Sequence, residues 1–169
     1  MRAAPLVALV LWSGLATFPA LAAPSLAAFD FELVNTSLEP TRADEEARLR
    51  MLDALLAEEL LRRDAFALVD VAPVRAEAAR NSSLRQCQGC ELDLARRLGA
   101  EYAALGWVQK VSNLILNVNI EIREVATNRV ALVKSVDMRG NNDESWIRAV
   151  RYLVRDIDDR RKANPRYGL

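Results

Sequence analysis

The residues best suited to chemistry in this sequence are its two cysteines, Cys87 and Cys90, which form a Cys-Gln-Gly-Cys motif. Covalent haem attachment is excluded because Glu91, and not histidine, follows the motif. Three alternatives stay open. The pair is a structural disulfide, a redox-active pair at the start of a helix, or part of a metal site completed by carboxylates or by a second subunit.

A second group of polar residues precedes a predicted helix near the C-terminus. Its members carry side-chain oxygen atoms or an indole, and they are Asn141, Asn142, Asp143, Glu144 and Trp146. Such oxygen atoms could hold a cation, although the spacing of a calcium loop is absent. The same residue types also form turns and helix N-caps, which is the interpretation we favour.

A third group lies where a predicted strand runs into a turn: Trp107, Gln109, Lys110 and Asn113. Aromatic and amide side chains of this kind are typical of the rim of a binding surface. For Trp107 we favour a place in the core, because strand alternation puts it on the same face as Leu105.

The amino-acid composition excludes several classes of function. The sequence has no histidine, which excludes an imidazole general base, a Ser-His-Asp triad and histidine metal ligands. It has 23 basic and 23 acidic residues, so the chain lacks the basic character of a nucleic-acid-binding protein.

Hydrophobic periodicity predicts the elements that position these groups, in the order β-α-β-α-β-β-β-α. The first helix is capped by Thr41, opens at Asp44 and closes at Arg63, and the second starts at Cys90 or Glu91 and stops before Gly99. A third helix buries Trp146, Val150, Leu153 and Ile157, and the tail from Arg160 onward is expected to fray. The strands are predicted at 27–34, 66–71, 102–111, 114–125 and 130–138, with a short helix at 74–80.

We therefore predict one α+β domain over residues 23–169, with a two-layer mixed sheet, helices packed on one face and a C-terminal antiparallel meander. The meander leaves one polar face of the sheet for solvent or for a partner.

Residues 1–22 are predicted to be a cleavable signal peptide. They combine a basic start at Arg2, an apolar stretch from Pro5 to Phe18 and the small-residue cleavage site Ala20-Leu21-Ala22. A membrane anchor is the weaker alternative, because the apolar stretch is shorter than the roughly 20 residues that span a bilayer. The prevalence of Ala and Arg indicates a bacterium, so we expect a periplasmic protein with no membrane span after cleavage.

The segment from Leu94 to Met138 resembles the α/β domain found at the N-terminus of TolB and in the curli secretion protein CsgG. Leu98-Gly99-Ala100-Glu101-Tyr102 leads into Leu105-Gly106-Trp107-Val108, and a long hairpin with Val125-Ala126-Thr127 at its turn follows. This resemblance covers about a third of the chain and implies a fold, not an activity.

Nearly the whole mature chain is also similar to a family of exported bacterial proteins that forms a domain of unknown function. The similarity is carried by four segments: 29–33, 87–93, 106–113 and 139–146. Members encoded near periplasmic quinoprotein alcohol dehydrogenases imply an accessory role beside such enzymes.

The sequence thus predicts a non-catalytic periplasmic accessory protein that acts through contact with another periplasmic protein, and that needs no cofactor. The contact surface is the Asn-rich sheet face or the loop at 140–146. The alternative is a thiol–disulfide redox protein that uses Cys87 and Cys90, and a solute- or metal-binding protein is a third, weaker option.

Overall fold

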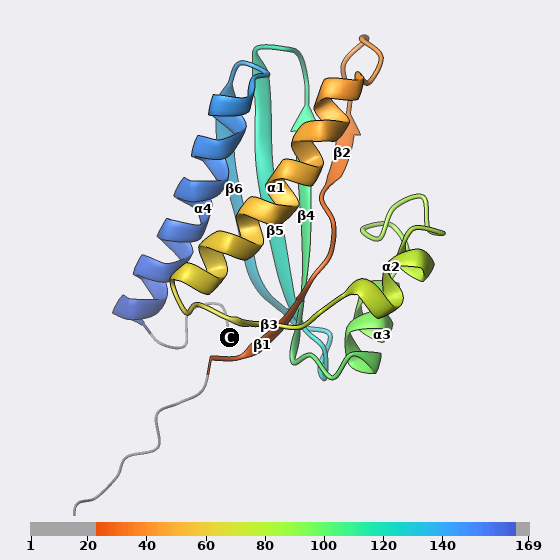
Figure 1. Ribbon diagram of the computed structural model, residues 1–169, viewed down its shortest axis with the longest axis vertical. Coiled ribbons are helices and arrows are strands. Elements are labelled where there is room, and N and C mark those ends of the chain that lie inside the picture. Colours follow the sequence, from red (N-terminus) through yellow and green to blue (C-terminus); the bar gives the residue numbers. More distant parts are fainter. Residues whose placement is uncertain (1–22, 165–169) are drawn as a thin grey trace, which may run out of the picture.

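The computed structural model describes residues 23–164 (Figure 1). The predicted signal peptide, residues 1–22, and the last residues, 165–169, lie outside this part of the chain. In chain order the elements are β1 (Ser25–Ala28), β2 (Glu32–Asn35), α1 (Ala43–Arg62), β3 (Ala67–Leu68), α2 (Ala72–Ala78), α3 (Cys90–Arg97), β4 (Tyr102–Lys110), β5 (Ile115–Glu124), β6 (Val130–Arg139) and α4 (Asp143–Ala163).

The strands form one mixed sheet in the order β3-β1-β4-β5-β6, and β2 pairs with β4 beyond the end of β1. The pairs that involve β1, β2 and β3 are parallel, whereas β4, β5 and β6 form an antiparallel meander. The predicted α+β class, mixed sheet and C-terminal meander are confirmed.

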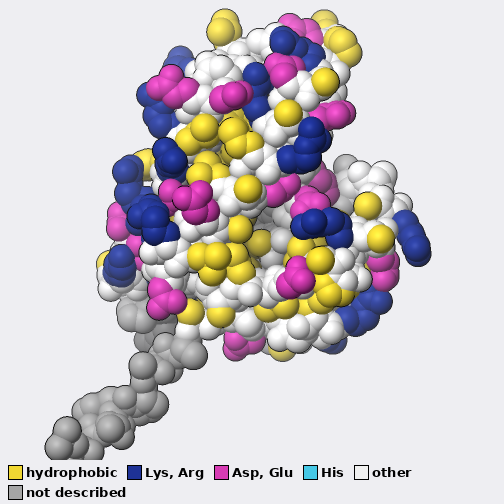
Figure 2. Space-filling model, viewed as in Figure 1, with side chains coloured by type: hydrophobic (Ala, Val, Ile, Leu, Met, Phe, Trp, Pro, Cys, Tyr) yellow, Lys and Arg dark blue, Asp and Glu magenta, His cyan; other side chains and the backbone are white. Residues whose placement is uncertain are grey.

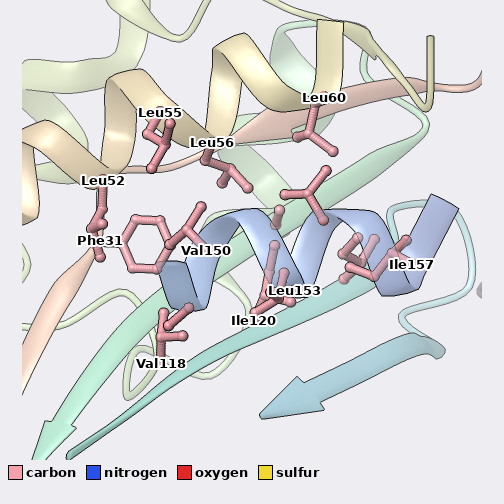
Figure 3. Packing of buried hydrophobic residues seen from close by; sticks show 14 of the residues in the cluster. Phe31, Leu52, Leu55, Leu56, Leu60, Val118, Ile120, Val150, Leu153 and Ile157 are labelled. Carbon is pink, nitrogen blue, oxygen red and sulfur yellow. The ribbon is translucent and has the colours of Figure 1, made fainter. Parts of the chain in front are cut away.

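The two long helices, α1 and α4, lie side by side on one face of the sheet (Figure 1). The predicted stripes are confirmed: Leu52 and Leu60 of α1 and Leu153 and Ile157 of α4 are at most 1% exposed (Figure 3). Each such side chain contributes roughly 1.5–3 kcal/mol by leaving water, so this layer is the main source of stability.

Helices α2 and α3 lie against the opposite face of the sheet, at one end only. Ala103 and Leu105 of β4 point toward them, whereas Ala104 and Val108 point toward α1 and α4. The prediction put all helices on one face of the sheet, and these two short helices differ from it. The reason is that α3 has its own apolar side, formed by Leu92, Leu94 and Ala95, which this end of the sheet covers.

The predicted strand at 27–34 is wrong as a single element. It is broken at Phe29–Phe31, because Phe29 packs beneath α3 while Phe31 packs in the main core. A regular strand would put both rings on one face. Gly106 makes room for the Phe31 ring, since a Cβ at this glycine would lie only 2.5 Å from a ring carbon.

The end of α4 also differs from the prediction. The helix continues to Ala163 instead of fraying from Arg160. Arg161 holds it in place, because its guanidinium lies 4.5 Å from the centre of the Phe66 ring and donates a hydrogen bond to the carbonyl of Ala65. Within residues 23–164, no helix has the length and apolarity needed to cross a bilayer.

Candidate functional site

A fully buried ion pair lies where the end of β4 meets the start of α1. Lys110 Nζ is 2.6 Å from Glu45 Oε1, and both side chains are 0% exposed. Burial by itself would raise the pKa of Glu45. Hydrogen bonds from Lys110, from the Arg42 backbone N–H and from Asn141 outweigh it and hold the pKa below its ordinary value. Glu45 therefore stays ionised beside Lys110.

Asn141 connects this ion pair to the rest of the network. Its Nδ2 donates to Glu45 Oε1 at 2.5 Å and to Asn113 Oδ1 at 3.1 Å. Its Oδ1 accepts from the Trp146 indole at 3.1 Å and from Arg48 Nη1 at 3.3 Å. All the hydrogen-bonding capacity of the amide is used, so one side chain joins α1, the β4–β5 hairpin and the loop before α4.

Charged side chains close the network on its solvent side. Arg48 binds Asp143 at 2.7 Å and Asp44 at 3.0 Å, and Glu39 lies 3.5 Å from Lys110 Nζ and accepts from Asn113. Each of the four carboxylates in this network thus lies beside Lys110 or Arg48, and the arrangement positions backbone segments instead of presenting a free acid, base or nucleophile.

The structure brings five of the predicted site residues together in this network: Lys110, Asn113, Asn141, Asp143 and Trp146. Asn142 caps α4 by accepting from the Ser145 backbone N–H at 2.9 Å, and Glu144 pairs with Arg148 on the surface. This geometry favours the cap over the cation site, because Asn142 and Asn141 already use their oxygens. Sequence reasoning missed Glu39, Glu45 and Arg48. The capping pattern was expected at Thr41 and Asp44, but the cap residue is Arg42, whose backbone N–H donates to Glu45.

The predicted grouping of Lys110 with Trp107 and Gln109 is wrong. Along β4 the side chains alternate, so Trp107 and Gln109 point to the face opposite Lys110. Trp107 is half-buried there, with the Arg85 guanidinium 4.1 Å from the centre of its ring.

Trp107 and Gln109 belong to a polar stretch of the meander that we call the amide face. In register across the three strands, Trp107 lies opposite Asn119 and Gln109 opposite Asn117. Asn119 and Asn117 in turn face β6. The members of the amide face are Trp107, Gln109, Asn117, Asn119, Ser135 and Asp137.

The two cysteines form a disulfide in the turn that leads into α3. Gln88 and Gly89 between them have left-handed backbones, with φ of 58° and 110°. The neighbouring Glu91 is 1% exposed; one oxygen binds Arg123 at 3.1 Å and the other lies 3.7 Å from Cys87 Sγ. The ligand atoms of Cys87, Cys90 and Glu91 cluster within 4.8 Å, but disulfide sulfurs are poor metal ligands, so the oxidised state does not suit a metal.

Asp53 is a further perturbed group that the sequence did not indicate. It lines a groove between α1 and α2 together with Asp30, and it accepts a hydrogen bond from the Phe31 backbone N–H at 2.7 Å. Burial, and secondarily the charge of Asp30, raise its pKa to about 6 against that hydrogen bond.

Comparison with known protein families shows to which family the chain belongs. The sequence profile of DUF3280, described as "Protein of unknown function (DUF2380)", matches residues 24–157. The chain belongs to this family. Membership in DUF3280 confirms the predicted resemblance to a domain of unknown function and brings no activity with it. No curated protein is significantly similar to the chain.

Solved structures similar to this DUF3280 chain share its fold at low sequence identity. The LpoB C-terminal domain from Salmonella enterica has a TM-score of 0.53 and 14% identity, over 72% of this chain and 86% of that domain. Lipoprotein GNA1162 from Neisseria meningitidis has a TM-score of 0.50 and 12% identity, over 83% and 96% of the two chains. TolB from Acinetobacter baumannii has a TM-score of 0.49 and 13% identity, over 85% of this chain and 29% of TolB, so the predicted likeness to its N-terminal domain is not established.

Proposed function

We propose that this protein is a non-catalytic accessory protein of the bacterial envelope, and that it acts by binding another periplasmic protein through the amide face. The observation that carries the proposal is the position of this face. Helices α2 and α3 cover the sheet only at the Ala103 and Leu105 end, which leaves Ser135 exposed and Gln109 and Asn117 partly exposed. The folds of LpoB and GNA1162 are consistent with an envelope protein of this kind.

The chemistry of the amide face suits a protein partner. Amide groups offer both donors and acceptors, and Trp107 gives the surface an aromatic side chain already fixed in place by Arg85. The loop at 140–146, our other predicted contact surface, is tied to Glu45 and Asn113 and contributes mainly to the fold. The absence of histidine from the sequence further favours binding over acid–base catalysis.

Site-specific photo-crosslinking in the bacterium that encodes the protein tests this proposal. A photoreactive residue at Asn117 or Ser135 should capture a discrete partner, whereas the matched positions Arg50 and Glu58 on the outside of α1 should not. Asn117→Arg should abolish the crosslink at Ser135 without lowering the melting temperature by more than a few degrees. Equal crosslinking from both sets, or multiple turnover of a substrate, would refute the proposal.

A more specific form of this function is an accessory role beside a periplasmic quinoprotein alcohol dehydrogenase. It is supported only by the family resemblance. A deletion strain should then grow slowly on alcohols and normally on sugars, and the Asn117→Arg gene should fail to restore growth. Normal growth of the deletion strain on alcohols would exclude the role beside an alcohol dehydrogenase, but it would not exclude an accessory role with another periplasmic protein.

The Glu91 carboxylate supports a second candidate, a thiol–disulfide protein. After reduction, this buried carboxylate, 3.7 Å from Cys87 Sγ, could act as a general base for the thiol when it attacks a partner disulfide. Measurement of the reduction potential decides between the two. A potential below about −300 mV, typical of structural disulfides, together with full function of a Cys87→Ser/Cys90→Ser variant, would exclude this candidate.

A further inference from the structure

Arginine side chains gather along the groove between α4 and β6. The groove is lined by Arg139 of β6 and by Arg148, Arg151, Tyr152 and Arg155 of α4, and Asp137 is its only lining carboxylate among the described residues. Over the whole chain the basic and acidic residues are equal in number, so this concentration is local. Basic side chains are plainly visible over α4 in Figure 2.

The arginines differ in how they are held. Arg148 pairs with Glu144 at 2.8 Å, and both side chains are at least 72% exposed, so water competes strongly for this pair. Arg151 lies 3.5 Å from Glu59 of α1. The Arg155 guanidinium lies 5.4 Å from the centre of the exposed Tyr152 ring, and no carboxylate among the described residues forms an ion pair with it. An incoming carboxylate would therefore find prepared donors.

The wall of the groove opposite α4 is the free edge of the sheet. Strand β6 ends the strand order, and its ten residues, Val130–Arg139, pair only with β5 among the described strands. Its outer backbone groups have no strand partner, and Val133 is 56% exposed. A strand edge of this length is a template for another strand.

We propose that this groove binds an extended acidic segment of a partner protein, which adds to the outer edge of β6 as a further strand. Alternate side chains of such a segment stand roughly 7 Å apart. Arg148 and Arg155 are seven residues apart, or roughly 10 Å along the helix axis, so two successive carboxylates can reach the row of guanidiniums. Backbone pairing supplies affinity, and Arg–carboxylate bonds select acidic sequences. The groove adjoins the amide face at Asp137, but the inference rests on the free edge of β6 and on the arginines, and it does not depend on what binds the amide face.

Fluorescence anisotropy with defined peptides tests the proposal on the full secreted chain. The probe is a labelled ten-residue peptide of alternating Glu and Val, and it should bind with an affinity that falls as salt rises. The same peptide with Lys in place of Glu should not bind. A version methylated on alternate backbone nitrogens keeps the charge but cannot pair along one edge, and it should bind at least fivefold more weakly.

The variant Arg139→Glu/Arg155→Glu should weaken binding of the acidic peptide at least tenfold. The matched variant Arg80→Glu/Arg97→Glu, which makes the same charge change far from the groove, should stay within twofold. Circular dichroism checks that both variants fold, and amide chemical shifts in the wild type should move along 130–139. Unchanged binding by the groove variant, equal binding of the methylated or Lys peptide, or preference for phosphatidylglycerol vesicles over the acidic peptide would overturn the proposal.

Discussion

Replacing Lys110 by methionine is expected to destabilise the protein strongly, because it leaves Glu45 buried without its countercharge. Removal of one partner of a buried ion pair typically costs about 3–5 kcal/mol. Glu45 keeps two donors, the Arg42 backbone N–H at 2.9 Å and Asn141 Nδ2 at 2.5 Å. We therefore expect a loss near the lower end, about 3 kcal/mol, which corresponds to a fall of about 6–12 °C in melting temperature.

Urea unfolding followed by circular dichroism measures this loss, with Arg148→Met as the control. Arg148 and its partner Glu144 are 72% and 80% exposed, so the control should change the free energy of unfolding by less than about 0.5 kcal/mol. The double variant Glu45→Met/Lys110→Met should be much more stable than the sum of its two single variants implies, since no buried charge remains. Changes below about 1 kcal/mol in both single variants, or simple additivity, would refute the reasoning.

The pH dependence of Lys110→Met gives a second check. The pKa of Glu45 is lowered in the folded protein, so the stability from its ionised form is present above the ordinary value of 4.5 and is lost as the pH falls through the folded pKa. The stability difference between wild type and Lys110→Met should therefore shrink below about pH 4.5. A difference that stays constant down to pH 3 would mean that Lys110 acts through packing alone.

Three further changes have definite expected results. Asp53→Asn should raise the melting temperature at pH 7 and leave it nearly unchanged at pH 4. Because the folded pKa is about 6 and the ordinary value is 3.8, the ionised carboxylate lowers the stability of the folded protein above pH 6 and has no such effect below pH 3.8. A gain in melting temperature that is equal at both pH values would contradict this. Gly106→Ala should lose about 1–3 kcal/mol in urea titration because its Cβ collides with the Phe31 ring, and adding Phe31→Leu should recover part of the loss. Cys87→Ser/Cys90→Ser should lose only about 2 kcal/mol, since the disulfide closes a very short loop, and a loss above about 4 kcal/mol would show that the bond supports more than its own turn.

Elements with long, regular patterns could be predicted from the sequence. The alternation of Leu116, Val118, Ile120 and Ile122 placed β5 and its buried face correctly, and the stripe from Trp146 to Ile157 placed α4. In these elements local periodicity and tertiary burial agree, so the pattern of side chains is sufficient.

The misses occur where tertiary packing overrides local pattern. Phe29 and Phe31 alternate as in a strand, but the chain breaks at Asp30 so that one ring can reach each core. No local signal marks this break, because it depends on helix α3, far along the sequence. The position of Lys110 was predictable in part. Lys110 lies an even number of residues after Ala104 and Val108, so strand alternation puts its side chain on the face of β4 that α1 and α4 cover, opposite to Trp107. Its partner Glu45 was not, because a buried countercharge 65 residues away leaves no trace in periodicity.

The position of β1 between β3 and β4 sets an order of assembly. Leu26 pairs with Tyr102, and the Ser25 backbone N–H donates to Glu101, 76 residues later in the chain. The β4–β6 meander needs only contacts between neighbours, so it can form early, whereas β1 must wait for β4. A chain that passes through a membrane channel amino end first would therefore keep its leading strand unpaired with β4 until Ala104 had emerged, which delays closure of the sheet until most of the chain is outside.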